Sequence, residues 1–314
     1  MKIKDITNYL EDFAPLEIQE NYDNSGLIVG DYESDVRGIL VTLDCVEEIV
    51  DEAIYKKCNL IVAHHPIIFK GLKKINGINY IERTVIKAIK NDIAIYAIHT
   101  NLDNIHNGVS FKIAKKIGLE NCRVLAPKLK CLKQLVVYCP TNFSEKLRAT
   151  LFENGAGSIG KYDNCSFTSF GKGTFLVDRN SKPFSGRLNE LNIKDEDRIE
   201  VVFPKHKEKD ILNAMIVSHP YEKVAYQIYS LENKNDMFGA GIVGELSKSS
   251  KAENFLSLIK SKMKTECIRH SALIKKEISR VAVCGGSGSF LLQDAMSAGA
   301  DIFITADFKY HQFF

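Results

Sequence analysis

Short apolar runs alternate with amphipathic stretches along the first 125 residues of the chain. The apolar runs at 38–44, 60–63 and 93–98 are rich in branched residues, as buried strands are. Apolar residues at helical spacing predict helices at 3–13, 47–57, 81–90 and 110–117, and Gly118 marks the end of the last one. Strands that alternate with helices predict a parallel sheet with right-handed crossovers.

The pattern changes near residue 127 and changes back near residue 246. Between these points we expect strands at 135–138, 175–177, 199–203 and 225–230, helices at 144–154 and 207–218, a glycine-rich segment at 155–160 and turns at 180–187. This order is typical of an α+β unit with a mostly antiparallel sheet. After the glycine-rich run 239–244, a helix at 252–263, a strand at 280–284, a helix at 290–298 and a strand at 301–305 restore the first pattern.

The fold prediction is therefore an α/β domain with a mostly parallel sheet, interrupted by an inserted α+β domain. The α/β domain would comprise residues 1–128 and 247–314, and the inserted domain residues 129–246. At 314 residues the chain is long enough for two domains.

Charge and cysteine content limit the partners and the cellular compartment to be expected. The 42 basic and 39 acidic residues give a net charge of +3, so neither a nucleic-acid nor a membrane partner is expected. The amphipathic N-terminus does not resemble a signal peptide, and no run approaches the roughly 20 apolar residues that cross a bilayer. Eight cysteines without a C-x-x-C pair favour a reducing cytoplasm.

Polar residues follow two of the expected strands at the ends where ligands bind. The run 61–63 leads into His64, His65 and Pro66, and the run 93–98 leads into His99 and the segment that ends at Asp103. Carboxyl ends of parallel strands line one crevice, so three imidazoles and a carboxylate should share one neighbourhood. That set suits one divalent metal ion or a pair of them.

A pair of metal ions is considered because the side chains of adjacent strand residues point in different directions. His64 and His65 would point to opposite faces of a regular strand, so each could serve one metal of a pair roughly 3.5–4 Å apart. Asp103 could bridge the two ions with its two carboxylate oxygens. The alternative is that these histidines only form local hydrogen bonds.

Three further motifs are open to two interpretations each. The segment 285–289 lies between a strand and a helix but does not satisfy G-x-G-x-x-G, so it is either a tight turn or a phosphate site. Asp307 and His311 are four residues apart in what should be a helix that begins near Ala306, with either a proton-transfer role or an ordinary helix start. For His219 and Pro220 a structural turn is favoured over a second metal site.

These residues together resemble a known family, the GTP cyclohydrolase 1 type 2 homologues, also called the Nif-three-like family. The resemblance covers essentially the whole chain and is carried by the segments 21–27, 64–66, 99–103, 286–288, 299–301, 305–307 and 310–311, with 155–160, 183–186 and 219–222 in the middle. It implies a dinuclear site with His64, His65 and Asp103 as ligands. It also implies a PII/CutA-like inserted domain and a ring-shaped hexamer built as a trimer of dimers.

Two departures from the family pattern stand out. The family usually has glycine where Ala306 stands. The family also completes its metal site with a histidine and a glutamate in a Gly-His-x-x-Ser-Glu-like segment, which would lie beyond Phe314. We therefore expect that the natural chain continues past that residue.

The predicted function is that of a metal-dependent hydrolase. The resemblance implies GTP as the substrate, with the purine ring opened at C8 by metal-activated water. His99 or His311 would move protons, with Asp307 beside His311. Imidazole ligands favour zinc or iron, and the carboxylate admits manganese or magnesium. The alternatives are a non-enzymatic metal-binding ring that senses a metabolite or binds a partner, and a different two-metal hydrolase such as a phosphoesterase or an amidase.

Overall fold

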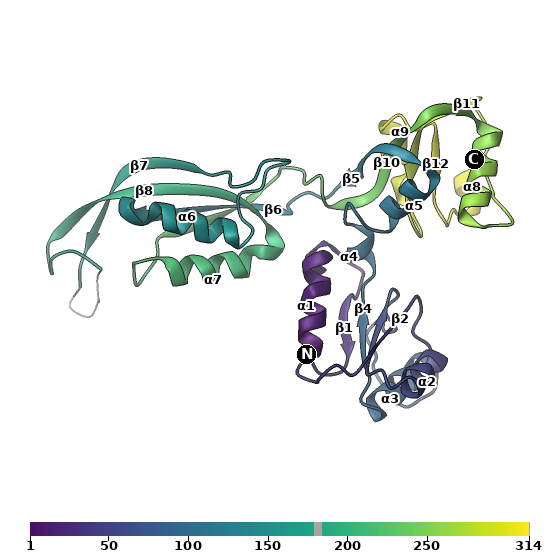
Figure 1. Cartoon of the computed structure of the whole chain (residues 1–314), viewed down its shortest axis with the longest axis horizontal. Helices are drawn as coiled ribbons and strands as arrows, with labels where there is room; N and C mark the ends of the chain where they lie inside the picture. Colours follow the sequence, from purple (N-terminus) through teal and green to yellow (C-terminus); the bar gives the residue numbers. More distant parts are fainter. Residues whose placement is uncertain (179–183, 314) are drawn as a thin grey trace. The chain divides into compact units, whose positions relative to one another are not determined.

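The chain forms two compact units, seen in Figure 1. The computed structural model describes residues 1–178 and 184–313. Unit 1 consists of Met1–Pro127 and Asp236–Phe314, and unit 2 is the segment Lys128–Asn235 between them. Unit 2 thus lies between the two segments of unit 1 along the chain, and the predicted domains stay a prediction.

The first sheet of unit 1 has the strand order β1-β4-β3-β2. Its strands are β1 (Gly26–Val29), β2 (Ile39–Thr42), β3 (Leu60–Ala63) and β4 (Ala94–Ala97). β2, β3 and β4 are parallel, and β1 pairs with β4 in the antiparallel sense. Helices α2 (Glu47–Tyr55) and α3 (Tyr80–Lys90) belong to the apolar cluster on one face, and α1 (Ile3–Phe13) to that on the other.

The continuous apolar sequence of β3 follows from burial on both of its faces. Ile61 and Ala63 belong to the cluster with α2 and α3, whereas Leu60 and Val62 belong to the cluster with α1. All four residues are buried. A strand covered on both sides needs apolar residues at every position, which is why it could be recognised from sequence.

The second sheet of unit 1 corrects the prediction of a mostly parallel sheet. Its order is β12-β11-β10-β5, with β5 (Leu119–Pro127), β10 (Gly239–Lys251), β11 (Glu277–Val283) and β12 (Ile302–Ile304). Only β11 and β12 are parallel in this sheet, since β10 is antiparallel to both of its neighbours. The prediction was wrong here because two strands were missed, namely β5 and β10, which pair with each other in the antiparallel sense.

Helices cover both faces of this second sheet. One cluster joins it to α5 (Val109–Ile117) and α8 (Ala252–Met263), and another joins it to α9 (Leu292–Ser297). The expected domain boundary at residue 246 falls inside β10, whereas unit 1 resumes at Asp236. The glycines of 239–244 serve close strand pairing here, since a Cβ on Gly239 would lie 2.2 Å from the carbonyl oxygen of Ala126.

Unit 2 is an antiparallel sheet with two helices on one side (Figure 1). The strand order is β7-β8-β6-β9, with β6 (Leu132–Pro140), β7 (Phe167–Leu176), β8 (Leu191–Pro204) and β9 (Tyr226–Leu231). Helices α6 (Ser144–Glu153) and α7 (Glu208–Ser218) share an apolar cluster with β6 and β8. The α+β prediction is confirmed, and the closer likeness to PII or CutA stays a prediction.

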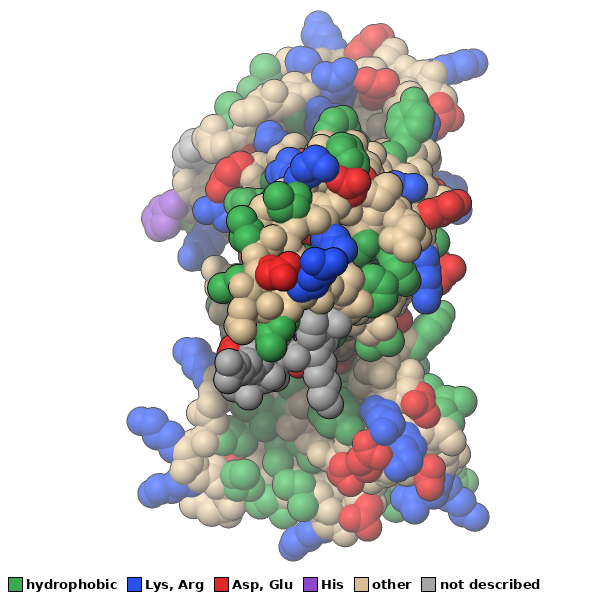
Figure 2. All heavy atoms as spheres, turned by 90° about the vertical axis from the view of Figure 1, so that its left-hand side faces the viewer, with side chains coloured by type: hydrophobic (Ala, Val, Ile, Leu, Met, Phe, Trp, Pro, Cys, Tyr) green, Lys and Arg blue, Asp and Glu red, His purple; other side chains and the backbone are tan. Residues whose placement is uncertain are grey.

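One end of unit 2 exposes apolar side chains along β7 and β8. They include Leu176, Leu191 and Ile193. Figure 2 looks onto this end of unit 2 and shows hydrophobic side chains interspersed with charged ones. Residues 180–183 of the predicted turn, and Pro183 of the family motif, lie outside the described residues.

The segment after β12 is not the helix that the sequence predicted. Residues 305–309 are irregular, and a single 3-10 turn follows at Tyr310–Phe313. Asp307 and His311 are therefore not on one face of an α-helix, and both are exposed. Phenylalanine side chains are unfavourable on a helix exposed to water. Here the Phe313 ring packs against that of Phe308, with the ring centroids 5.7 Å apart. None of the described helices is long and apolar enough to span a membrane.

Candidate metal centre

Two neighbouring parallel strands deliver the histidines. β3 ends at Ala63, and the backbone N–H groups of His64 and His65 still donate to the carbonyls of Thr42 and Leu43, next to β2. β4 ends at Ala97, and His99 then forms the N-cap of the short helix α4 (Thr100–Asp103). The backbone is thus held by hydrogen bonds at both strand ends.

The structure brings the three imidazoles together. Their ring centroids are 4.9 Å apart for His64 and His65, 5.2 Å for His64 and His99, and 5.4 Å for His65 and His99. One ligand nitrogen from each ring lies within 4.8 Å of the others, so this group could hold a metal ion. His99 was expected to move protons, and it lies as close to the centre as the two expected ligands.

Each of these rings forms a hydrogen bond through Nδ1, and none of the described residues bonds to its Nε2. His64 Nδ1 donates to the carbonyl of Ile98 at 2.8 Å. His65 Nδ1 lies 2.8 Å from Asp44 Oδ1, and His99 Nδ1 lies 2.7 Å from Asp23 Oδ1. Because all three partners are oxygen acceptors, Nδ1 donates in each ring, and the neutral form of each ring has its lone pair on Nε2. An imidazole oriented in this way is the form that binds a divalent metal.

Asp103 supplies a carboxylate beside the histidines. It lies one helical turn after His99, and its backbone N–H donates to the carbonyl of that residue at 3.1 Å. Burial raises the pKa of Asp103 to about 6, with a smaller increase from the charge of Asp23 and an opposing effect of His99 and His65. Among the described residues its carboxylate has neither a hydrogen bond nor an ion pair. A half-buried carboxylate without a hydrogen-bond donor among the described residues fits a cation that balances its charge.

Burial also favours the ligand form of His64. The pKa of this residue is lowered first by burial and then by the nearby His99 and His65, whereas the hydrogen bond to Ile98 acts in the opposite direction. The ring is therefore neutral at neutral pH, as a metal ligand must be.

Asp23 and Asp44 were missed as site residues in the sequence. The Asp23 side chain is fully buried and accepts hydrogen bonds from His99, from the Thr100 backbone at 3.0 Å and from the Thr100 hydroxyl. Burial alone would raise the pKa of Asp23, but these hydrogen bonds outweigh it and lower the pKa. Two signals existed, since Asp44 follows β2, the third parallel strand at this edge, and Asp23 lies in the family segment 21–27.

The remaining candidates lie elsewhere or serve the backbone. Among the described residues, neither Asp307 nor His311 forms a hydrogen bond or ion pair with the histidines, so their catalytic role stays a prediction. In the glycine-rich turn, two N–H groups are already used, that of Gly285 by the Ser110 hydroxyl and that of Gly288 by the Thr305 hydroxyl. This favours the tight-turn interpretation.

His219 has a structural role, as the sequence favoured. Its Nε2 donates to the carbonyl of Tyr138 at 2.9 Å, and its Nδ1 accepts the backbone N–H of Tyr221 at 3.0 Å. The side chain is buried, so no ring nitrogen remains for a metal.

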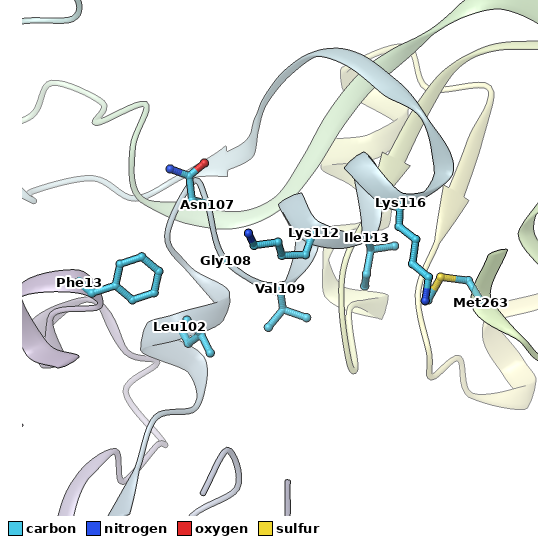
Figure 3. A pocket seen from close by; sticks show the side chains of 9 residues that line it. All are labelled: Phe13, Leu102, Asn107, Gly108, Val109, Lys112, Ile113, Lys116 and Met263. Carbon is cyan, nitrogen blue, oxygen red and sulfur yellow. The ribbon is translucent and has the colours of Figure 1, made fainter. Parts of the chain in front are cut away.

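A pocket of about 360 Å³ in unit 1 is separate from the histidines (Figure 3). It is mostly apolar and is lined by Phe13, Leu102, Asn107, Gly108, Val109, Lys112, Ile113, Lys116 and Met263. Its lining contains no histidine, cysteine or carboxylate. The chemistry of the chain therefore points to the histidine cluster rather than to this pocket.

Comparison with known proteins identifies relatives of this chain. The chain is 40% identical over 307 residues to a Bacillus subtilis protein named GTP cyclohydrolase 1 type 2 homolog, covering 98% of this chain and 82% of that protein. A protein of the same name from Listeria monocytogenes is 37% identical over 309 residues, with 97% and 82% covered.

Solved structures give the same result. A Bacillus cereus protein described as related to NIF3 superposes with a TM-score of 0.86 and 36% identity, covering all of this chain and 84% of that one. A Staphylococcus aureus protein superposes with a TM-score of 0.74 and 31% identity, with 100% and 83% covered. The family model described as Duf34/NIF3 (NGG1p interacting factor 3) matches residues 1–314. On this evidence the chain belongs to the Duf34/NIF3 family.

Proposed function

We propose that this protein is a divalent-metal-dependent hydrolase that opens the ring of a purine nucleotide such as GTP. The observation that carries the proposal is the set of three imidazoles with free Nε2 atoms beside the unpaired carboxylate of Asp103. The printed names of the relatives support GTP cyclohydrolase chemistry as the reaction to test first.

The donor set fits two ions. His64, His65 and Asp103 would hold the ions. A bound divalent ion supplies a Lewis acid and lowers the pKa of the water it holds. Imidazole nitrogens favour zinc or iron, and the carboxylate also admits manganese or magnesium.

His99 and Asp23 form the pair that we assign to proton transfer. Asp23 holds Nδ1–H of His99, so that Nε2 can take a proton from the attacking water and return it. In the proposed reaction the water oxygen bonds to C8 and the C8–N9 bond breaks. One of the two water protons goes to N7 and the other to N9, so that a formamide remains on N7 and an amine on N9. His311 and Asp307 would help only if the segment after Ile304 moves toward the centre.

Activity and metal content test the proposal together. The protein is loaded with each candidate metal, and loss of GTP and formation of the ring-opened product are followed by chromatography. Turnover is expected for the wild type and for His270→Ala, a matched exposed histidine of unit 1, but not for His65→Ala. Stoichiometric metal without GTP loss, in the wild type as in His65→Ala, would contradict the cyclohydrolase proposal.

Assembly is tested separately. A hexamer built as a trimer of dimers is proposed from the family resemblance, and the mass of the particle in solution checks it. A metal-free hexamer without any turnover would favour the non-enzymatic alternative, in which the ring is a scaffold or a metabolite sensor.

A further inference from the structure

Two exposed aromatic rings border the metal centre. Tyr22 is 62% exposed and Phe69 is 44% exposed, although large aromatic side chains usually gain stability from burial. Their ring centroids are 6.1 Å apart with an angle of 45° between the ring planes. Phe69 also meets His99 edge to face, with centroids 6.3 Å apart. The aromatic surface is therefore continuous with the imidazoles.

Both rings stand on backbone that is held in place. Tyr22 precedes Asp23, whose buried carboxylate is bonded to His99 and Thr100. Phe69 follows Ile67 and Ile68, which pack into the apolar cluster beneath the first sheet. The two loops are joined directly, since the Asn24 side-chain amide donates to the carbonyl of Ile68 at 2.7 Å. Because the backbone at both rings is already ordered, a ligand loses less binding free energy to the ordering of these loops.

We infer that Tyr22 and Phe69 form a binding subsite for a planar heteroaromatic ring, presented to the metal centre with its reacting atom toward the histidines. Exposed aromatic faces on ordered loops beside polar catalytic groups are typical of ligand sites. Every nucleobase has a π-face that can stack on such rings, whereas an aliphatic amide or a sugar phosphate has none. The subsite thus favours a base-containing substrate over an aliphatic amide or a sugar phosphate. This inference rests on the proposed function for the direction in which the ring is presented.

Equilibrium binding tests the subsite without requiring turnover. Guanosine provides the ring without phosphates, and ribose 5-phosphate provides the phosphate without the ring. Both are titrated into the metal-loaded protein by calorimetry. Phe69→Leu keeps an apolar side chain but removes the π-face, and Tyr22→Leu does the same on the other loop. Phe13→Leu is the matched control, because Phe13 is 51% exposed on α1 and does not contact the histidines.

We expect guanosine to bind the wild type and Phe13→Leu equally, and Phe69→Leu roughly tenfold more weakly. Ribose 5-phosphate binding should be equal in all variants, and metal content should be unchanged. Equal guanosine binding in all variants, or no saturable binding to the wild type, overturns the subsite. A parallel fall in ribose 5-phosphate binding also overturns it, since Phe69 would then only shape the loop. If guanosine behaves as expected and GTP is not consumed, the proposed reaction fails while the subsite stands.

Discussion

Two histidine-proline sequences in this chain have opposite uses. His65 and Pro66 follow β3 in unit 1, and His219 and Pro220 follow α7 in unit 2. At His219 both ring nitrogens are bonded to backbone groups. At His65 only Nδ1 is bonded, and the ring faces two other imidazoles. The comparison indicates what a candidate ligand histidine needs: one ring nitrogen fixed by a hydrogen bond, the other without one, and further ligand side chains close by.

The largest expected effect tests this contrast directly. His64→Ala or His65→Ala should lower the affinity for zinc by more than about a hundredfold, because each removes a ligand nitrogen and leaves the remaining donors too few. His219→Ala should leave zinc affinity unchanged. Competition with a chelator of known affinity measures all three variants. A large loss in His219→Ala would show that the two histidine-proline sequences are not as different as the hydrogen bonds indicate.

The next effect concerns the carboxylates behind the imidazoles. Asp23→Asn replaces the charged acceptor for His99 Nδ1–H, and we expect a loss of about tenfold to a hundredfold in metal affinity. Asp44→Asn should matter less, because the Asp44 side chain is 61% exposed and water can replace it. The same chelator competition checks both, and an equal loss in the two variants would contradict the role of burial.

A third effect appears in the stability of unit 2. His219→Ala leaves the carbonyl of Tyr138 and the N–H of Tyr221 without their partner, which costs about 1–3 kcal/mol. His65→Ala, at a half-exposed position, should cost much less. Hydrogen exchange of the β6 amides in the full-length protein measures the change. Unaltered protection in His219→Ala would exclude a structural role for this residue.

The smallest effect is a pH dependence at the same residue. Burial lowers the pKa of His219 below its ordinary value of 6.5, although the Tyr138 hydrogen bond and the charge of Glu196 oppose this. Protonation then favours the unfolded state. The contribution of His219 to stability is therefore complete above pH 6.5 and is lost as the pH falls through the folded-state pKa. Protection of the β6 amides should fall in that range, and His219→Gln, which cannot protonate, should flatten that fall.

The strands that could be predicted are those with a clear local pattern of apolar residues. β3 and β4 are buried on both faces, so their apolar runs are unbroken. β10 begins with Gly239, and glycine has no side chain to reveal a buried face, so the segment resembled a linker. β5 contains Glu120, Asn121 and Arg123 and shows no clean period. Whether a strand pairs parallel or antiparallel depends on partners distant in sequence, and the local pattern does not contain this information.

The candidate centre was predictable to a similar depth. Ligands commonly bind at the ends of parallel strands, so the apolar runs that precede His64, His65 and His99 were enough to group these residues. Asp23 could not be added to them from the strand pattern, because it lies in an irregular segment before an antiparallel strand and its role depends on a contact with His99, 76 residues away. The prediction for the region after β12 was wrong because a local pattern was present but the predicted helix was not. Asp307 and His311 have helical spacing, but the chain there forms only a short turn.

The pairing of β5 with β10 describes how unit 2 was accommodated. Pro127 and Gly239 face each other at the end of that antiparallel ladder, so the two strands form a hairpin whose loop is an entire domain. β6 and β9, the first and last strands of unit 2, are also antiparallel neighbours, with Leu132 opposite Leu231. In each unit, the strand at which the chain leaves and the strand at which it returns are therefore direct neighbours. A short turn could close either hairpin, which makes the inserted domain a removable module.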